Sequence, residues 1–424
     1  MCPNLLYTFG QGGVVPIPED PEISVLYNAS DHTINNQFGS LFKHLSSGTK
    51  YAFHWFRMIT PPRGVLKISD SGSLNYSNAF TPLRITKPVY CPGNGYLYFC
   101  TSDGSSIVRI DPGSSGNIEY ASPTYITNPS SSGDINGING ILTHKYTIIW
   151  VKVSPGTLHV LTLDCALETA SYQEISVTTG GNSGIQAYPP ILLLNNKVLI
   201  MTSGNRAIFL DVDTYIATSV KVYEYNQFAN IPSMTSVMGF NGKVFYAPVQ
   251  YVSSVDSNED LSGGAGRRHI LWYDYFRDEF GVINNTKFTE TYIPSQGLIH
   301  SHQWDGAQLA PNGKLYFMPN DKSFPGSNYL VLEIDPDNNN ILFFPITLAF
   351  NHHSNLMWRG CILNSDMKIY GAHYAGAKNE NSPFQVVGPL VVENVGETNI
   401  DIILDSGDIK FYNSLYNRYF NKVN

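Results

Sequence analysis

The chain has 424 residues, of which 42% are apolar and only 14% are charged, and its formal net charge is −8. An apolar fraction of this size supports a folded core, whereas the charged fraction is well below the usual quarter. The 26 Lys and Arg residues form no basic block, which argues against a nucleic-acid partner, and the lack of a long apolar run argues against a membrane span and a secretory signal.

The residue types favour β-structure with many tight connections. Gly (36) and Pro (25) supply turns, and 27 Tyr with 22 Phe supply aromatic side chains that are common in strands. The five cysteines are scattered and form no CxxC pair, so we expect buried free thiols rather than a disulfide scaffold. The composition therefore predicts an all-β fold.

A short hairpin with an apolar second strand recurs seven times along the chain. In order, the copies are SSGTKYAFHWF around Lys50, PGNGYLYFC around Tyr96, LTHKYTIIWV around Lys145, LNNKVLIM around Lys197, FNGKVFYAP around Lys243, PNGKLYFMP around Lys314 and NSDMKIYGA around Lys368. Neighbouring copies are about 50 residues apart, except for one longer step before Lys314. That step contains the polar, Gly-rich stretch 253–268, which we interpret as a surface insertion.

A second apolar run follows each of six hairpins and ends near an Asp or a turn. These runs are VLKISDSGS (65–73), IVRIDPGSSG (107–116), HVLTLDCAL (159–167), AIFLDVDT (207–214), ILWYDYFRDEF (270–280) and VLEIDPDNNN (331–340). A further strand comes after the turn, for example ILFFPIT at 341–347. The sequence pattern therefore predicts four strands in each repeat. We interpret Asp70, Asp111, Asp211 and the oxygen-rich stretch 335–341 as turn residues rather than calcium ligands.

Several predicted strands are apolar at successive positions, as in YLYFC, TIIWV and KVLIM. A strand of a two-sheet sandwich alternates apolar and polar residues because one face meets water. Here both faces require cover, and blades stacked around an axis provide it without helices. We find no amphipathic helix that could cover a parallel sheet.

The pattern resembles a β-propeller, with Trp-x-Gly before an inner strand, Asn-Gly-Lys at the first turn and Val-Leu-x-Ile-Asp on the third strand. The resemblance covers residues 38–400 and implies one propeller of seven four-stranded antiparallel blades, with eight as the alternative. Residues 1–37 form an N-terminal arm that could supply a closing strand such as 23–27. Residues 401–424 form a closing hairpin or a contact segment; the hairpin-like stretch 400–414 could start an eighth blade.

Two pairs of histidines are the candidate metal ligands of the chain. His300 and His302 lie two apart, and His352 and His353 follow one repeat later at a similar offset before a Trp. In a propeller, neighbouring blades could bring these imidazoles together near Asp305, as a site for zinc or another divalent metal. The alternative is that the histidines bond to loop backbone, in which case no cofactor is expected.

Two aromatic stretches also carry charged residues and could stack on a glycan or anchor a protein interface. The candidate contact residues are Trp272, Tyr273, Tyr275, Arg277, Tyr416 and Tyr419. The alternative interpretation is aromatic packing between blades. No GxSxG, HExxH or arginine cluster occurs.

We therefore predict a non-enzymatic component of a virus particle, assembled in the host cytoplasm and serving as a tail or capsid accessory protein or a receptor-binding module. The polar, charge-poor composition is similar to that of phage structural proteins. Its expected partners are other virion proteins, or a host surface glycan or protein. The alternatives are a metal-dependent hydrolase or lyase with its site at the channel, and an intracellular protein-interaction hub.

Overall fold

The computed structural model describes a set of segments that covers all seven repeats. These are residues 21–25, 38–43, 49–54, 65–69, 73–77, 88–101, 104–113, 118, 121–130, 140–144, 146–180, 187–203, 206–222, 234–248, 270–283, 292–293, 297–298, 304–310, 312–319, 330–346, 356–363, 368–375, 390–393 and 395. Within these residues, no helix has the length and apolar character needed to cross a membrane.

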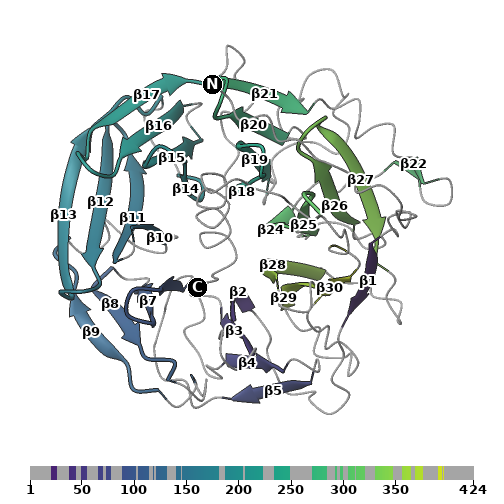
Figure 1. The fold of residues 1–424 in the computed structure, drawn as a ribbon, viewed down its shortest axis with the longest axis horizontal. Helices are drawn as coiled ribbons and strands as arrows, with labels where there is room; N and C mark the ends of the chain where they lie inside the picture. Colours follow the sequence, from purple (N-terminus) through teal and green to yellow (C-terminus); the bar gives the residue numbers. More distant parts are fainter. Residues whose placement is uncertain are drawn as a thin grey trace, which may run out of the picture.

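Seven four-stranded antiparallel sheets surround a common centre (Figure 1), which confirms the prediction of seven blades over the alternative of eight. Blade 1 contains β2 (Phe38–Lys43), β3 (Lys50–His54), β4 (Val65–Ile68) and β5 (Leu74–Ser77). Blade 2 contains β6 (Val89–Cys91), β7 (Tyr96–Cys100), β8 (Ser106–Ile110) and β9 (Thr124–Thr127). Blade 3 contains β10 (Gly140–His144), β11 (Thr147–Ser154), β12 (Thr157–Asp164) and β13 (Thr169–Ser176). Blade 4 contains β14 (Ile191–Leu192), β15 (Lys197–Thr202), β16 (Arg206–Asp211) and β17 (Ala217–Lys221). Blade 5 contains β18 (Met234–Met238), β19 (Lys243–Pro248), β20 (Ile270–Asp274) and β21 (Glu279–Ile283).

Blade 6 contains β24 (Trp304–Leu309), β25 (Leu315–Pro319), β26 (Leu330–Asp335) and β27 (Asn340–Pro345). A separate pair, β22 (Tyr292–Ile293) and β23 (Gly297–Leu298), lies in the link between blades 5 and 6. Blade 7 takes β28 (Leu356–Leu363), β29 (Ile369–Ala375) and β30 (Leu390–Glu393) from the last repeat. Its fourth strand is β1 (Glu22–Val25), from the other end of the chain.

The N-terminal strand closes the ring. β1 pairs with β30 from Glu22 opposite Glu393 to Val25 opposite Leu390, and Ile23 packs against the cluster between blades 6 and 7. The insertion 253–268 and the stretch 400–414 lie outside the described residues.

Seven clusters of buried apolar side chains are described, and each lies between two neighbouring blades, including the pair formed by blades 7 and 1. Strand β15 shows how one sequence serves two clusters. Val198 and Ile200 face blade 3, while Leu199 and Met201 face blade 5. Because successive strand residues point to opposite faces, a run of apolar residues covers both. The two-sided burial that KVLIM predicts is therefore confirmed.

The Trp-x-Gly stretches lie inside first strands rather than before them. Trp304 starts β24, and the register against β25 shifts between Asp305 and Ala307, so that Gly306 is the extra residue of a bulge. Gly306 has φ +69°, a conformation that favours glycine. The same register shift occurs in β28 between Arg359 and Cys361.

An Asp at the end of the third strand organises the turn to the fourth strand. In blade 4, Asp211 Oδ1 accepts hydrogen bonds from the amides of Asp213 (3.1 Å) and Thr214 (2.9 Å). Asp111 and Asp335 accept from the amide two residues further along. The turn-residue interpretation of Asp111, Asp211 and 335–341 is therefore confirmed, whereas Asp70 lies outside the described residues.

The lysine that starts the second strand lies beside this Asp. Lys197 is opposite Asp211 and Lys243 is opposite Asp274 in the strand register, and in blade 6 Lys314 Nζ lies 2.5 Å from Asp335 Oδ2. Lys and Asp therefore recur in the repeats because they are cross-strand neighbours at the same end of the blade.

This pairing predicts a pH-dependent contribution from Asp335. Burial acts to raise the pKa of its carboxyl, but hydrogen bonds from Lys314, the Asp337 amide and Asn338 outweigh burial, so the pKa lies below its ordinary value of 3.8. A lowered carboxyl pKa gives stability that is present above the ordinary pKa and is lost as pH falls through the folded-state pKa. Asp335→Asn should lower the free energy of unfolding by about 1 kcal/mol at pH 7, and by much less at an acidic pH below the folded-state pKa.

Urea unfolding of wild type, Asp335→Asn and Lys314→Met at both pH values measures this contribution. Lys314→Met should weaken the pH dependence without abolishing it, because the hydrogen bonds from the Asp337 amide and Asn338 to Asp335 remain. An equal deficit for Asp335→Asn at both pH values would show that its charge contributes nothing.

Candidate functional site

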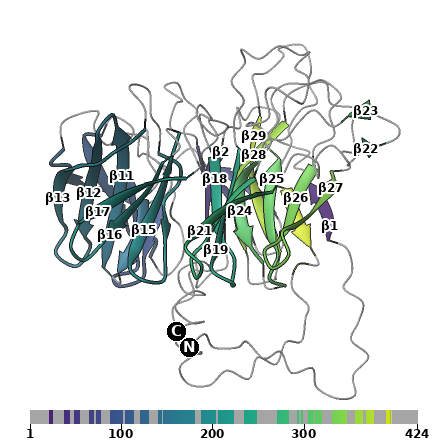
Figure 2. The ribbon, with the colours of Figure 1, turned by 90° about the horizontal axis from the view of Figure 1, so that it is seen from above.

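One face of the propeller is well defined, and we call it the turn face. In a four-stranded antiparallel blade, the turn from first to second strand and the turn from third to fourth strand lie at the same end. These turns line one side of the ring (Figure 2). Both chain ends of blade 7, Glu22 of β1 and Glu393 of β30, also lie at this end.

Polar contacts on the turn face join the first turn of one blade to the last turn of the next. Asn94 of blade 2 donates to the Cys165 carbonyl of blade 3 (2.8 Å), and His144 of blade 3 lies 2.9 Å from Asp213 of blade 4. Arg109 of blade 2 pairs with Glu168 of blade 3. These contacts hold the last turns of blades 3 and 4 against the neighbouring blade.

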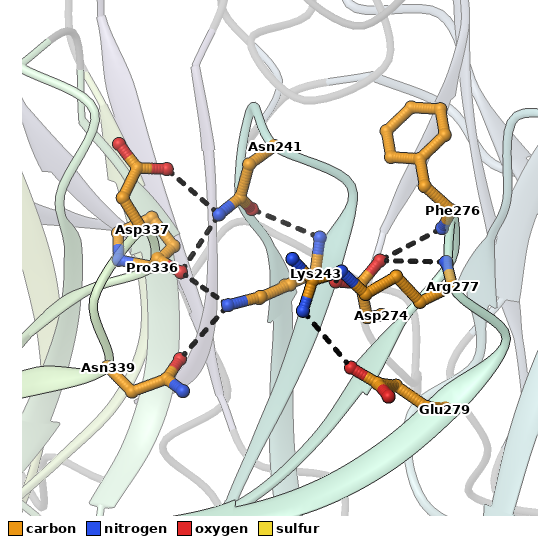
Figure 3. A network of polar contacts seen from close by, with 9 residues as sticks. All are labelled: Asn241, Lys243, Asp274, Phe276, Arg277, Glu279, Pro336, Asp337 and Asn339. Carbon is orange, nitrogen blue, oxygen red and sulfur yellow. Dashed lines mark hydrogen bonds and ion pairs between the residues drawn. The ribbon is translucent and has the colours of Figure 1, made fainter. Parts of the chain in front are cut away.

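A further network of polar contacts joins blades 5 and 6 (Figure 3). Asn241 Nδ2 donates to the Pro336 carbonyl (2.8 Å) and to Asp337 Oδ1 (3.0 Å). Lys243 Nζ donates to the same carbonyl (3.2 Å) and to Asn339 Oδ1 (3.4 Å). Its ammonium also lies 5.3 Å from the Trp272 ring centroid. This lysine therefore ties blade 5 to the turn of blade 6.

The predicted aromatic contact residues separate onto different surfaces. Trp272 packs in the seam between blades 5 and 6, whereas Tyr273 and Tyr275 pack in the seam between blades 4 and 5. Arg277 lies in the turn between β20 and β21, with 71% of its side chain exposed, and its guanidinium approaches Glu279 (3.4 Å). Tyr416 and Tyr419 lie outside the described residues.

Three large apolar side chains are exposed in the last turns of three consecutive blades. Leu167 (72%) lies in blade 3, Ile216 (64%) in blade 4 and Phe276 (57%) in blade 5. We call these residues the apolar row. In blade 6 the exposed residues of the corresponding turn, Asp337 and Asn338, are polar. Sequence reasoning missed the row because exposure within a turn has no local apolar pattern.

Acidic side chains surround the apolar row. Glu168 lies beside Leu167, Asp213 precedes Ile216, and Asp278 and Glu279 follow Phe276 in the sequence. Glu168 is paired with Arg109, Asp213 with His144 and Glu279 with Arg277, and the side chains of Asp213 and Glu279 remain 56% and 48% exposed. An exposed apolar row bordered by carboxylates suits a partner surface that combines apolar and basic groups.

The predicted metal site is only partly within the described residues. His300, His302, His352 and His353 lie outside them. Asp305 is described, and its Oδ1 accepts a hydrogen bond from the Gly306 amide at 2.7 Å. Across the described segments, no group of three or more His, Cys, Asp or Glu residues has the arrangement of a metal site. The histidine site therefore stays a prediction.

A chain of hydrogen bonds crosses three strands of blade 3. His159 Nε2 lies 3.1 Å from Ser154 Oγ, its Nδ1 lies 2.6 Å from the Tyr172 hydroxyl, and that hydroxyl donates to Glu174 (2.9 Å). The order Ser–His–Tyr–Glu resembles a nucleophile with its base. His159 is only 8% exposed, however, and the nearby Gly156 amide already donates to Thr179 Oγ1 (3.0 Å). We therefore interpret the chain as support for the sheet.

Comparison with known proteins identifies the fold alone. No protein-family model and no curated protein matches the chain. Similar solved structures include a streptogramin B lyase (11% identity, TM-score 0.55, 88% of this chain and 98% of that one). They also include a virginiamycin B lyase from Staphylococcus aureus (10%, 0.54, 88% and 99%) and the WD40 propeller domain of Doa1 (9%, 0.52, 89% and 100%). Such low identities carry no activity across to this chain.

The first turn of blade 5 gives a test of how Phe276 is held. Gly242 has φ +78°, and a Cβ added there would lie 2.7 Å from the Phe276 ring. Gly313 is the equivalent residue of blade 6, with φ +81° and no atom within 4 Å of an added Cβ. Gly313→Ala should therefore lower the free energy of unfolding by about 1 kcal/mol, which is the cost of placing a Cβ at a positive φ. Gly242→Ala should lower the free energy of unfolding further, because the Phe276 ring must also move.

Urea unfolding of both variants measures the difference, and the rate of trypsin cleavage after Arg277 reports on the turn itself. Cleavage should speed up in Gly242→Ala and not in Gly313→Ala. Equal losses of stability with equal cleavage rates would show that Phe276 does not depend on Gly242.

Proposed function

We propose that this chain is a non-enzymatic binding component of a larger assembly, and that the apolar row contacts another protein of that assembly. The observation that carries the proposal is the exposure of Leu167, Ile216 and Phe276 in the same turn of consecutive blades. Single exposed apolar side chains are ordinary on a protein surface. Here the three residues lie in the connection between third and fourth strands of consecutive blades. Contacts from Asn94 and His144 hold two of these connections against the neighbouring blade, which preorganises the contact surface.

The chemistry around the row supports a protein partner more than a glycan. Sugars bind through flat aromatic faces with hydrogen-bonding groups beside them, and the row has one aromatic ring among two aliphatic side chains. Protein interfaces combine buried apolar anchors with a polar rim. Arg277 and Glu279 form such a rim beside Phe276, and Asp213 does so near Ile216. The partner should present apolar groups together with Lys or Arg.

We further propose that the assembly is a virus particle, in which the chain acts as a tail or capsid accessory protein or as a receptor-binding module. The support is compositional, since the chain is rich in polar uncharged residues and only 14% charged. A closed ring also suits a structural part, because closure leaves few unpaired strand edges to aggregate.

Incorporation into particles tests both parts of the proposal. The row variant carries Leu167→Ser, Ile216→Ser and Phe276→Ser, and the matched control carries Tyr125→Ser, Val220→Ser and Leu342→Ser. The control residues lie on fourth strands and are 56%, 40% and 54% exposed. Removing three interface anchors should lower the amount of chain in purified particles at least ~10-fold, while wild type and control remain incorporated. Quantitative mass spectrometry of the particles gives the ratio.

The outcomes separate the two parts. Wild type found only in the soluble lysate contradicts the role in a particle. Normal incorporation of the row variant contradicts the row as the contact surface, as does equal loss of the control. All three proteins should share one unfolding temperature, because the substituted side chains are exposed.

A further inference from the structure

The outer strand of blade 3 differs from the outer strands of the other blades, which also lie at the rim of the ring (Figures 1 and 2). β13 has eight residues, whereas β1, β5 and β9 have four each. β17 ends in Lys221, β21 begins with Glu279 and β27 ends in Pro345. Short length, charged residues and proline keep sheet edges from pairing with other chains. Of these features, β13 has only one charged residue, Glu174.

The strand register shows which backbone groups of β13 point outward. β13 pairs with β12 along its whole length without a register shift. One residue beyond β13, the Val177 amide donates to the Gly156 carbonyl (3.0 Å). Because hydrogen-bonded and non-hydrogen-bonded pairs alternate along an antiparallel ladder, the odd-numbered residues of β13 bond to β12. The even-numbered residues direct their N–H and C=O groups away from β12, and these are Ala170, Tyr172, Glu174 and Ser176.

Side chains on both faces of β13 anchor it to its own blade. Tyr172 packs in the seam between blades 2 and 3, and Ile175 packs in the seam between blades 3 and 4. The Tyr172 hydroxyl also donates to Glu174 at 2.9 Å. The outer edge is therefore held in the extended conformation that a further strand would need, which lowers the cost of pairing.

Two copies of β13 match each other across a two-fold axis perpendicular to the sheet. Such an axis leaves each face of the sheet on its own side, so residues opposite each other must point to the same face. The axis therefore passes through a residue. An axis at Gln173 places Ala170 opposite Ser176 and uses all four outward-pointing residues of each copy. It also places Glu174 opposite the uncharged Tyr172, whereas an axis at Glu174 would place two carboxylates directly opposite each other.

We propose that β13 pairs antiparallel with β13 of a second copy of this chain, with Gln173 on the two-fold axis. The third blades of the two copies then form one continuous sheet. Because the ring is round (Figure 1), its rim curves away on both sides of β13, so the contact is small and the dimer dissociates readily. The axis reverses the strand direction, so the two turn faces point in opposite directions. The inference does not depend on the proposed function, because it concerns only the rim.

Cysteine crosslinking tests the register. At the axis, the two copies of residue 173 form a non-hydrogen-bonded pair with Cα atoms about 4.5 Å apart, which suits a disulfide. Gln173→Cys should therefore form at least ~10-fold more covalent dimer under mild oxidation than wild type does with its five native cysteines. Dithiothreitol should reverse it, and peptide mapping should join the two introduced thiols.

Two cysteine variants provide matched controls. Ser171→Cys lies on the same strand, but its two copies would be about 13 Å apart along the strand in this register. Thr218→Cys lies on the short outer strand β17 and is exposed, so it reports random collisions. Both should crosslink no more than wild type. Equal crosslinking of either control, or no gain for Gln173→Cys, overturns the proposed pairing.

Sedimentation of the unmodified chain tests the dimer without crosslinking. Wild type should pass from monomer to dimer between about 1 µM and about 100 µM, as expected for a small interface. Ser176→Pro removes one outward N–H from each copy and keeps the bonds to β12, so it should raise the dissociation constant about 10-fold. An unchanged constant overturns the proposal. A wild type that stays monomeric also overturns it, even if this edge binds a strand of another protein.

Discussion

The structure depends on covering both faces of every sheet. Each second strand carries apolar side chains at successive positions, and a strand directs these to opposite faces. A blade standing alone would expose both faces to water, at a loss of about 25 cal/mol for each Å² of apolar surface. Seven seams remove this exposure. In the seam between blades 7 and 1, Tyr370 and Val391 pack with Leu66 and Ile68, while β1 adds Ile23 to the seam between blades 6 and 7.

The same packing of blades determines where the candidate site lies. Once blades stand side by side, the first turn of one blade lies against the last turn of the next. Asn94, His144 and Asn241 each cross a seam at this level. Asp residues at the ends of third strands shape the turns, and the turns of blades 3 to 5 then present one exposed apolar side chain each. A binding surface can arise in this way from residues that belong to no pocket.

The sequence predicted the features that repeat and missed those that do not. Apolar runs such as KVLIM predict two buried faces because the rule involves only neighbouring residues, and Asp-Pro and Asn-rich tails predict turns for the same reason. By contrast, Trp272 and Tyr273 are adjacent in sequence but pack in different seams, which depends on strand register. The exposure of Phe276 depends on how its turn packs against the first turn of blade 5, so no local pattern reports it.

Alanine substitution at two adjacent residues of β15 tests the two-sided packing most directly. Leu199 and Ile200 are both at 0% exposure, but they lie in seams on opposite faces of blade 4. Leu199→Ala and Ile200→Ala should each lower the free energy of unfolding by about 3 kcal/mol, because each leaves a cavity between two blades. A loss below about 0.5 kcal/mol for either one would mean that its face of the sheet is open to water, and would contradict the ring of stacked blades.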